Sequence, residues 1–200
     1  MMRRAARLAP LCVAACLGAC ASTPPSHFYT LTSVPAPATA PAPAPATLSV
    51  NVGPVAIPAI VDLPQIVVST GPNQVAIDEF NRWASPLANN ISRVVAEDLV
   101  VMLGTPRVSL FQQSLNLDAA YRVAIEVQTF ESALGDAASL NAVWIVRRAK
   151  DGRSHTGRTT VREPTGDKSF DALAAAHSRA LARLSQDVAD AIRALDRAAP

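Results

Sequence analysis

Tyr121-Arg122-Val123-Ala124-Ile125-Glu126-Val127-Gln128-Thr129-Phe130 is the stretch of this chain that decides its fold class. Apolar or aromatic side chains recur at every second position, at Tyr121, Val123, Ile125 and Val127, and polar Arg122, Glu126 and Gln128 lie between them. Successive side chains of a strand point to opposite faces of its sheet. The alternation therefore predicts a strand with one buried and one solvated face.

The residues after this stretch predict two more strands and a closing helix. Leu140–Arg148 and Ser154–Val161 are strand-like, and Asp151-Gly152 between them is typical of a tight hairpin turn. From about Ser169 to Ala194 the apolar residues recur at helical spacing. The C-terminal element is therefore expected to be an amphipathic helix.

The residues before this stretch predict strands followed by a helix. Thr47–Val55 alternates, and two short β-rich runs, Gln65–Ser69 and Gln74–Ile77, flank the turn-like Thr70-Gly71-Pro72-Asn73. A helix is expected from about Pro86 to Leu103, with Ser85 as its N-cap, and a short strand over Arg107–Phe111.

The order of elements is therefore strands, helix, strands, helix. Strand hairpins between helices favour a mixed, mostly antiparallel sheet with two main helices packed on it. We expect an α/β fold of the α+β kind, in one domain over residues 48–197.

The N-terminus has the pattern of a lipoprotein signal peptide over residues 1–19. Three arginines and no acid precede a short apolar core, which ends in Leu17-Gly18-Ala19-Cys20. Lipidation is predicted at Cys20, which would carry a covalent diacylglycerol and an N-acyl chain; Val13-Ala14-Ala15-Cys16 is a competing register. Two or more chains give a stable anchor where one would not.

Residues 20–47 are expected to form a lipidated N-terminus with a first short strand at His27–Leu31. A Pro/Ala run follows from Pro35 to Thr47. Proline fixes φ and removes a hydrogen-bond donor, so the run is extended and semi-rigid. It is either a tether or an exposed loop between the first strand and the rest of the domain.

The search for chemistry finds no catalytic or metal-binding set. Cleavage before Cys20 leaves no second cysteine, and His27, His155 and His177 lie far apart in ordinary contexts. Loss of three signal-peptide arginines leaves 15 basic against 16 acidic residues, so nothing suggests a nucleic-acid partner. We expect no enzyme activity and no cofactor besides the lipid on Cys20.

One segment, Asp78–Leu87, has a composition typical of an interface. Phe80, Arg82 and Trp83 come just before the predicted helix, and tryptophan and arginine are enriched at interface hot spots. Together with Asp62 they are candidate partner-binding residues. The alternative is structural: the aromatic rings fix the helix entry, and Arg82 pairs with Asp62, Asp78 or Glu79.

Several runs together resemble the ABC-type transport auxiliary lipoproteins, the PqiC/YmbA family. They are Phe28–Leu31 after the lipidated cysteine, Val50–Pro58, Val61–Val67, Asn81–Leu87 and the helix Ile91–Leu99. The resemblance implies a fold like the N-terminal domain of TolB. It also implies a lipid-anchored protein on the inner leaflet of the outer membrane, facing the periplasm; Ala21, in place of Asp, is consistent with that sorting.

The same resemblance implies an MCE-domain protein as partner and, indirectly, an inner-membrane permease and ATPase. The first hypothesis is therefore a docking subunit for intermembrane phospholipid transport, with a homo-oligomer possible. The alternatives are a lipid carrier with its own apolar cavity, a general envelope-integrity lipoprotein, and an envelope enzyme without an evident nucleophile–base set.

Overall fold

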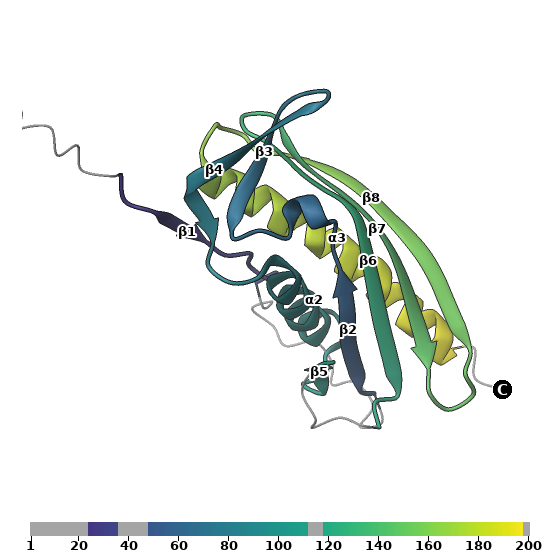
Figure 1. Ribbon diagram of the computed structural model, residues 1–200. Coiled ribbons are helices and arrows are strands. Elements are labelled where there is room, and N and C mark those ends of the chain that lie inside the picture. Colours follow the sequence, from purple (N-terminus) through teal and green to yellow (C-terminus); the bar gives the residue numbers. More distant parts are fainter. Residues whose placement is uncertain (1–23, 36–47, 112–117, 198–200) are drawn as a thin grey trace, which may run out of the picture.

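The computed structural model describes residues 24–35, 48–111 and 118–197. Cys20 and most of the Pro/Ala run lie outside these residues. The described elements, labelled in Figure 1, are β1 (His27–Tyr29), β2 (Val50–Ala56), the 3₁₀ turn η1 (Ala59–Val61), β3 (Gln65–Gly71), β4 (Gln74–Trp83), α2 (Leu87–Leu103), β5 (Val108–Leu110), β6 (Tyr121–Ala133), β7 (Ala137–Arg148), β8 (Ser154–Pro164) and α3 (Phe170–Arg197).

The larger sheet has the strand order β5-β2-β6-β7-β8 and curves around α3 (Figure 1). Its long ladders, β6 with β7 and β7 with β8, are antiparallel, and β2 pairs in parallel with both β5 and β6. The predicted alternation of β6 is confirmed, because Tyr121, Val123, Ile125 and Val127 are all buried. A register shift between Val127 and Thr129 then turns Phe130 inward.

The smaller sheet has the order β1-β4-β3. β3 and β4 form the predicted hairpin, with Gly71 paired to Gln74 across the turn. β1 pairs in parallel with the end of β4, where Phe28 is the register partner of Arg82 and Tyr29 that of Trp83. The expected fold class is confirmed, with the strands divided between two mixed sheets.

The two helices cover one face of the larger sheet. α3 packs on β6, β7 and β8, and α2 packs on α3, β2 and β5. The predicted N-cap of α2 was wrong by one residue: Pro86 is the N-cap, without a side-chain hydrogen bond, and its carbonyl accepts the N–H of Asn90 at 3.0 Å. Gly104, with φ +66°, ends the helix as predicted.

The segment after β1 is held firmly on the domain. Leu31 is fully buried, and the N–H groups of Thr32 and Val34 donate to Ser178 and to the carboxylate of Asp98. Leu48 on the other side of the Pro/Ala run also packs against the core. The run therefore joins two docked segments, and the link from Cys20 to the domain is residues 21–26.

Candidate functional site

Trp83, one of the predicted partner-binding residues, is a core residue. It is the last residue of β4 and only 5% exposed. Its ring meets Phe130 and His177 edge-on, at centroid distances of 6.2 and 6.3 Å. The Trp83 side chain therefore has almost no surface to offer a partner.

Arg82 and Phe80 lie on the exposed part of the same strand. Arg82 donates from Nε to the carbonyl of Glu79 at 3.0 Å, and its guanidinium lies 3.8 Å from the Glu79 carboxylate. Of the three acids considered, Glu79 is thus its partner. The Asp78 carboxylate accepts hydrogen bonds from the backbone N–H groups of Phe80 and Asn81 and from the Asn81 side chain. Burial alone would raise the pKa of Asp78, but the hydrogen bonds have the larger effect, and its pKa is lowered.

Asp62 lies directly after η1 and is exposed. Its N–H donates to the carbonyl of Ala59 at 3.3 Å, which closes the 3₁₀ turn. The turn positions Ile60 and Val61 beside the β3–β4 hairpin. Asp62 therefore directly follows Val61, which lines this groove, but is not itself a lining residue.

This groove, which we call the hairpin groove, lies between the hairpin, η1 and β6. It has a volume of about 380 Å³, and its lining residues are Pro58, Ile60, Val61, Val67, Ser69, Val75 and Gln128–Ser132. β2 pairs with β6 only as far as Glu126, so the groove borders the part of β6 beyond that pairing. Ile60 and Val75 are 57% and 48% exposed, and Ile77 next to them on the hairpin is 50% exposed.

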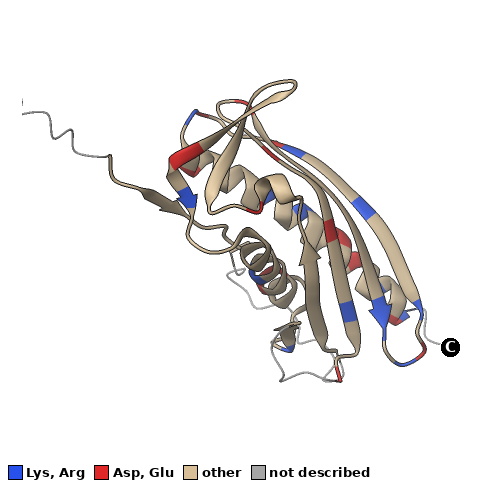
Figure 2. Ribbon diagram, in the orientation of Figure 1, with Lys and Arg blue, Asp and Glu red and all other residues tan. Residues whose placement is uncertain are grey.

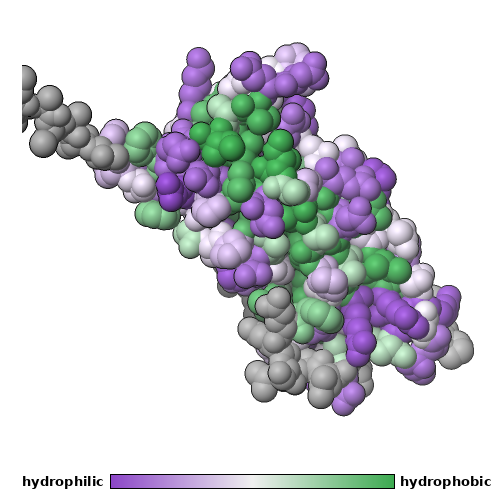
Figure 3. Space-filling view, viewed as in Figure 1, coloured by the Kyte–Doolittle hydropathy of each residue, from purple (hydrophilic) through white to green (hydrophobic). Residues whose placement is uncertain are grey.

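The hairpin carries no charge from its start at Gln65 to Ile77. From Leu8 to Ile77, Asp62 is the only Asp, Glu, Lys or Arg of the sequence. The tip of the hairpin is accordingly uncoloured in Figure 2, where charged residues appear only farther along β4, and Figure 3 shows an apolar area below the tip that continues toward the larger sheet. Exposed hairpins usually carry charges that prevent unwanted pairing. An uncharged apolar projection of this kind is typical of a surface that a partner covers.

Ser132 and His177 form a buried pair behind the hairpin groove. Ser132 Oγ lies 2.8 Å from His177 Nε2, and His177 Nδ1 has no hydrogen-bond partner among the described residues. Burial lowers the pKa of His177 to about 3. A catalytic serine needs an accessible hydroxyl and a base oriented by a third group, and this pair has neither in the part of the chain that the structure describes.

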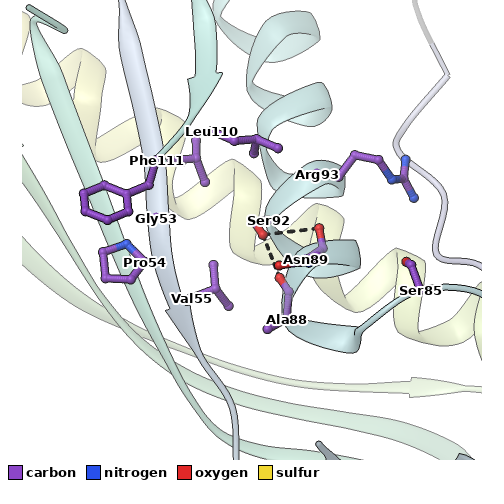
Figure 4. Close-up of a pocket in the computed structure, with 11 residues that line it drawn as sticks. Gly53, Pro54, Val55, Ser85, Ala88, Asn89, Ser92, Arg93, Leu110 and Phe111 are labelled. Carbon is purple, nitrogen blue, oxygen red and sulfur yellow. Dashed lines mark hydrogen bonds between the residues drawn. The ribbon is translucent and has the colours of Figure 1, made fainter. Parts of the chain in front are cut away.

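A second groove, of about 510 Å³, lies between β2, Phe111 and the first turns of α2 (Figure 4). Two of its polar side chains, Ser92 and Arg93, already have partners. Ser92 donates to the carbonyls of Ala88 and Asn89, and Arg93 binds Glu97 at 2.9 Å and the carbonyl of Leu31 at 2.6 Å. Arg93 and Glu97, four residues apart on α2, form a surface ion pair. Ser85 and Asn89 are the other polar side chains that line this groove.

Gly53 shapes that groove. Its φ of +122° is a conformation that side chains rarely adopt, and a Cβ there would lie 2.8 Å from Cβ of Phe111. The N–H of Phe111 donates to the carbonyl of Val52 at 2.9 Å, which holds Phe111 against the end of β2. The glycine of the Val50–Pro58 run is thus needed for the close approach of these two segments.

Within residues 24–35, 48–111 and 118–197, no group of three or more His, Cys, Asp or Glu side chains could hold a metal ion. None of the described helices is both long and apolar enough to cross a membrane.

Comparison with known proteins gives a family and a fold. A model of the ABC-type transport auxiliary lipoprotein component matches residues 29–189. No curated protein matches. The chain is similar to the crystal structure of protein XCC0632 from Xanthomonas campestris, at 22% identity and a TM-score of 0.68, over 86% of this chain and 98% of that one. It is also similar to the crystal structure of an uncharacterized protein, at 19% identity and a TM-score of 0.69, over 84% and 99% of the two chains.

Proposed function

Because this chain belongs to the family of ABC-type transport auxiliary lipoprotein components, we propose that it is a non-enzymatic docking subunit of an MCE-type lipid transport system. Lipid on Cys20 anchors it to the inner leaflet of the outer membrane. The domain then faces the periplasm and binds the end of an MCE-domain assembly, which connects to an inner-membrane permease and ATPase. Phospholipid passes between the membranes through that assembly.

The observation that carries this proposal is the exposed apolar surface of the hairpin groove, in whose lining Glu131 is the one charged residue. The centres of protein interfaces are depleted in charge and well packed, with polar residues at the rim. Ile60 and Val75 provide exposed apolar side chains in the groove, Ile77 lies next to Val75 on the hairpin, and Asp62 is an exposed charge directly after Val61. Arg82 and Phe80, at the base of the same hairpin, extend the predicted contact toward β1.

The grooves favour docking over lipid carriage. A carrier must enclose acyl chains in an apolar cavity, whereas the hairpin groove and the β2–α2 groove are open hollows of about 380 and 510 Å³. Open apolar hollows of this size suit side chains of a protein partner.

The test is capture of a purified MCE-domain partner by the lipidated protein in nanodiscs. Ile60→Glu and Val75→Glu each place a carboxylate in the lining of the groove. We expect each to weaken capture at least about tenfold, since burying an unpaired charge costs more than the roughly 1.4 kcal/mol that a factor of ten represents.

Ile145→Glu is the matched control. Ile145 is also an exposed apolar strand residue, but it lies on the uncovered face of β7. Its substitution should leave capture unchanged. Full capture by both groove variants would contradict docking through the hairpin groove.

A further inference from the structure

We propose that Phe28 is a second membrane contact, which inserts into the lipid–water interface beside the Cys20 anchor and orients the domain. This inference deepens the proposed function and rests on its lipid anchor. Phe28 has the largest exposed fraction, 65%, of the exposed large hydrophobic side chains of the described residues. An exposed phenylalanine costs least where a lipid surface covers it.

The length of chain between the anchor and Phe28 is short. Eight residue steps separate Cys20 from Phe28, and a fully extended chain covers at most about 29 Å in that number of steps. The bilayer surface therefore lies within about that distance of Phe28 in every orientation of the domain. A short tether of this kind keeps the effective concentration of Phe28 at the bilayer surface high. Even a weak affinity of Phe28 for the lipid–water interface is therefore enough to keep it there for much of the time.

Phe28 also has a fixed direction relative to the domain. β1 is an edge strand paired with β4, and Tyr29 points toward the domain, where its hydroxyl donates to Asn81 at 2.9 Å and its ring lies 5.9 Å from Phe170. Neighbouring side chains of a strand point to opposite faces. Phe28 therefore points away from the domain, and its direction is fixed because β1 is held on the domain by its pairing with β4 and by the contacts of Tyr29.

The surroundings of Phe28 are compatible with a lipid surface. Residues 20–61 contain no Asp, Glu, Lys or Arg, so nothing on its own segment opposes the approach of phospholipid headgroups. Across the strand pair lies Arg82, the register partner of Phe28. Of the nearby acids, Glu79 pairs with Arg82 and Asp78 binds backbone N–H groups, and Asp171 lies in the first turn of α3.

Membrane contact at Phe28 has a consequence for docking. A single lipid-anchored residue lets a domain rotate freely about its tether, whereas a second contact restricts the rotation. With β1 against the membrane, the larger sheet extends away from it, as the opposite positions of β1 and the end of β7 in Figure 1 indicate. The hairpin groove then stays in one orientation for an incoming partner.

The experiment places an environment-sensitive NBD fluorophore at Phe28→Cys in the lipidated protein. The matured chain has no other free thiol, because its remaining cysteine, Cys20, is acylated, so labelling is specific. The protein is reconstituted into vesicles of phosphatidylethanolamine and phosphatidylglycerol. We expect a blue-shifted emission, quenching by spin-labelled acyl chains and loss of quenching by iodide.

Ile145→Cys, on the far end of β7, is the matched site and should remain fully quenched by iodide. The melting temperatures of the two cysteine variants without the fluorophore should equal that of the native protein, because both substituted side chains are exposed. Equal iodide quenching at positions 28 and 145 would overturn the proposal. So would shielding of position 28 that appears only when the protein partner is added.

The result separates the two proposals. If the protein does not float with the vesicles at all, the lipid anchor of the proposed function fails. If it floats but position 28 stays in water, the anchor holds and only the Phe28 contact is refuted.

Discussion

His177 stacks face to face on Phe130, with ring centroids 3.8 Å apart and planes inclined by 8°. The contact joins α3 to the inner face of β6 after its register shift. His177 is completely buried and has one hydrogen-bond partner, Ser132, while its Nδ1 has none among the described residues. An imidazole in this position is held in its neutral form.

The first prediction is that His177 makes the fold sensitive to acid. Burial lowers its folded pKa to about 3, whereas the unfolded value is about 6.5. Between these values the unfolded chain binds more protons, so the stability that neutral His177 provides is fully present above about pH 6.5 and is lost as the pH falls toward 3. The loss amounts to about 1.4 kcal/mol per pH unit within that window.

Urea unfolding of the native protein and of His177→Gln at pH 7.5, 5.5 and 4.5 measures this loss. Glutamine keeps a polar group near Ser132 and does not titrate. The stability advantage of the native protein should shrink as the pH falls. A constant difference between the two proteins at all three values would show that His177 does not carry the acid sensitivity.

Asp98 provides the second prediction. Its buried carboxylate accepts hydrogen bonds from Val34 N–H at 2.7 Å and from the Ser185 hydroxyl at 2.9 Å. Asp98 on α2 thus connects the segment that follows β1 to α3. Burial raises its pKa, so the charged form is disfavoured in the folded state and stability falls as the pH rises through the folded pKa. Asp98→Asn should therefore be at least as stable as the native protein at pH 7.5.

Asp98→Ala should instead lose about 1–3 kcal/mol, because the partly buried N–H of Val34 and the buried hydroxyl of Ser185 would lose their acceptor. Thermal melts of both variants at pH 7.5 and 4.5 test the contrast. A destabilised asparagine variant at pH 7.5 would indicate that the negative charge itself is needed.

The third prediction concerns Gly157 and Trp144, which are paired across β7 and β8. A Cβ on Gly157 would lie 2.2 Å from Cζ2 of the Trp144 ring, whose Nε1–H donates to Thr159 at 3.0 Å. Gly157→Ala should therefore cost about 1–3 kcal/mol through overpacking. Gly71→Ala is the control, because its Cβ would meet no atom nearer than 3.8 Å.

Trp144→Phe removes the six-membered part of the indole that the new methyl group would strike. The double variant Gly157→Ala/Trp144→Phe should thus lose less stability in urea than the sum of the two single variants. Additive losses would mean that the two side chains do not compete for the same space.

Much of the fold could be predicted from local pattern. The alternation of Tyr121–Val127 and the helical spacing of Leu173–Leu195 are confirmed. A strand or helix that is buried on one face alone has apolar residues at a regular spacing, which can be recognised in the sequence. The inward turn of Phe130 could not be predicted, because it follows from a bulge. The separate small sheet was missed as well, because its β1–β4 pairing joins residues more than 50 positions apart.

The candidate site was predicted less well for a related reason. The Asp78–Trp83 segment looked like an approach to a helix, but it is the second half of β4, and strand phase decides which of its residues face outward. The hairpin groove is assembled from η1, the hairpin and β6, so no single stretch of sequence contains it. The absence of charge from Leu63 to Ile77 was the one local signal that could have indicated it.

The fourth prediction separates Trp83 from its neighbour Arg82. Trp83→Ala would leave a cavity beside Phe130 and His177 and should cost about 3–5 kcal/mol. Arg82→Ala removes a half-exposed side chain with a 3.8 Å contact to Glu79 and should change stability by less than about 1 kcal/mol. Both variants are natural choices for a partner-capture assay, yet only Arg82→Ala reports on binding alone. Capture lost by Trp83→Ala should therefore accompany a fall in the urea midpoint, and Trp83→Phe, which refills most of the space, should restore both together. If Trp83→Ala unfolded at the native urea concentration and still failed to capture the partner, Trp83 would have to contact that partner directly, and the inward orientation of its ring would not describe the bound state.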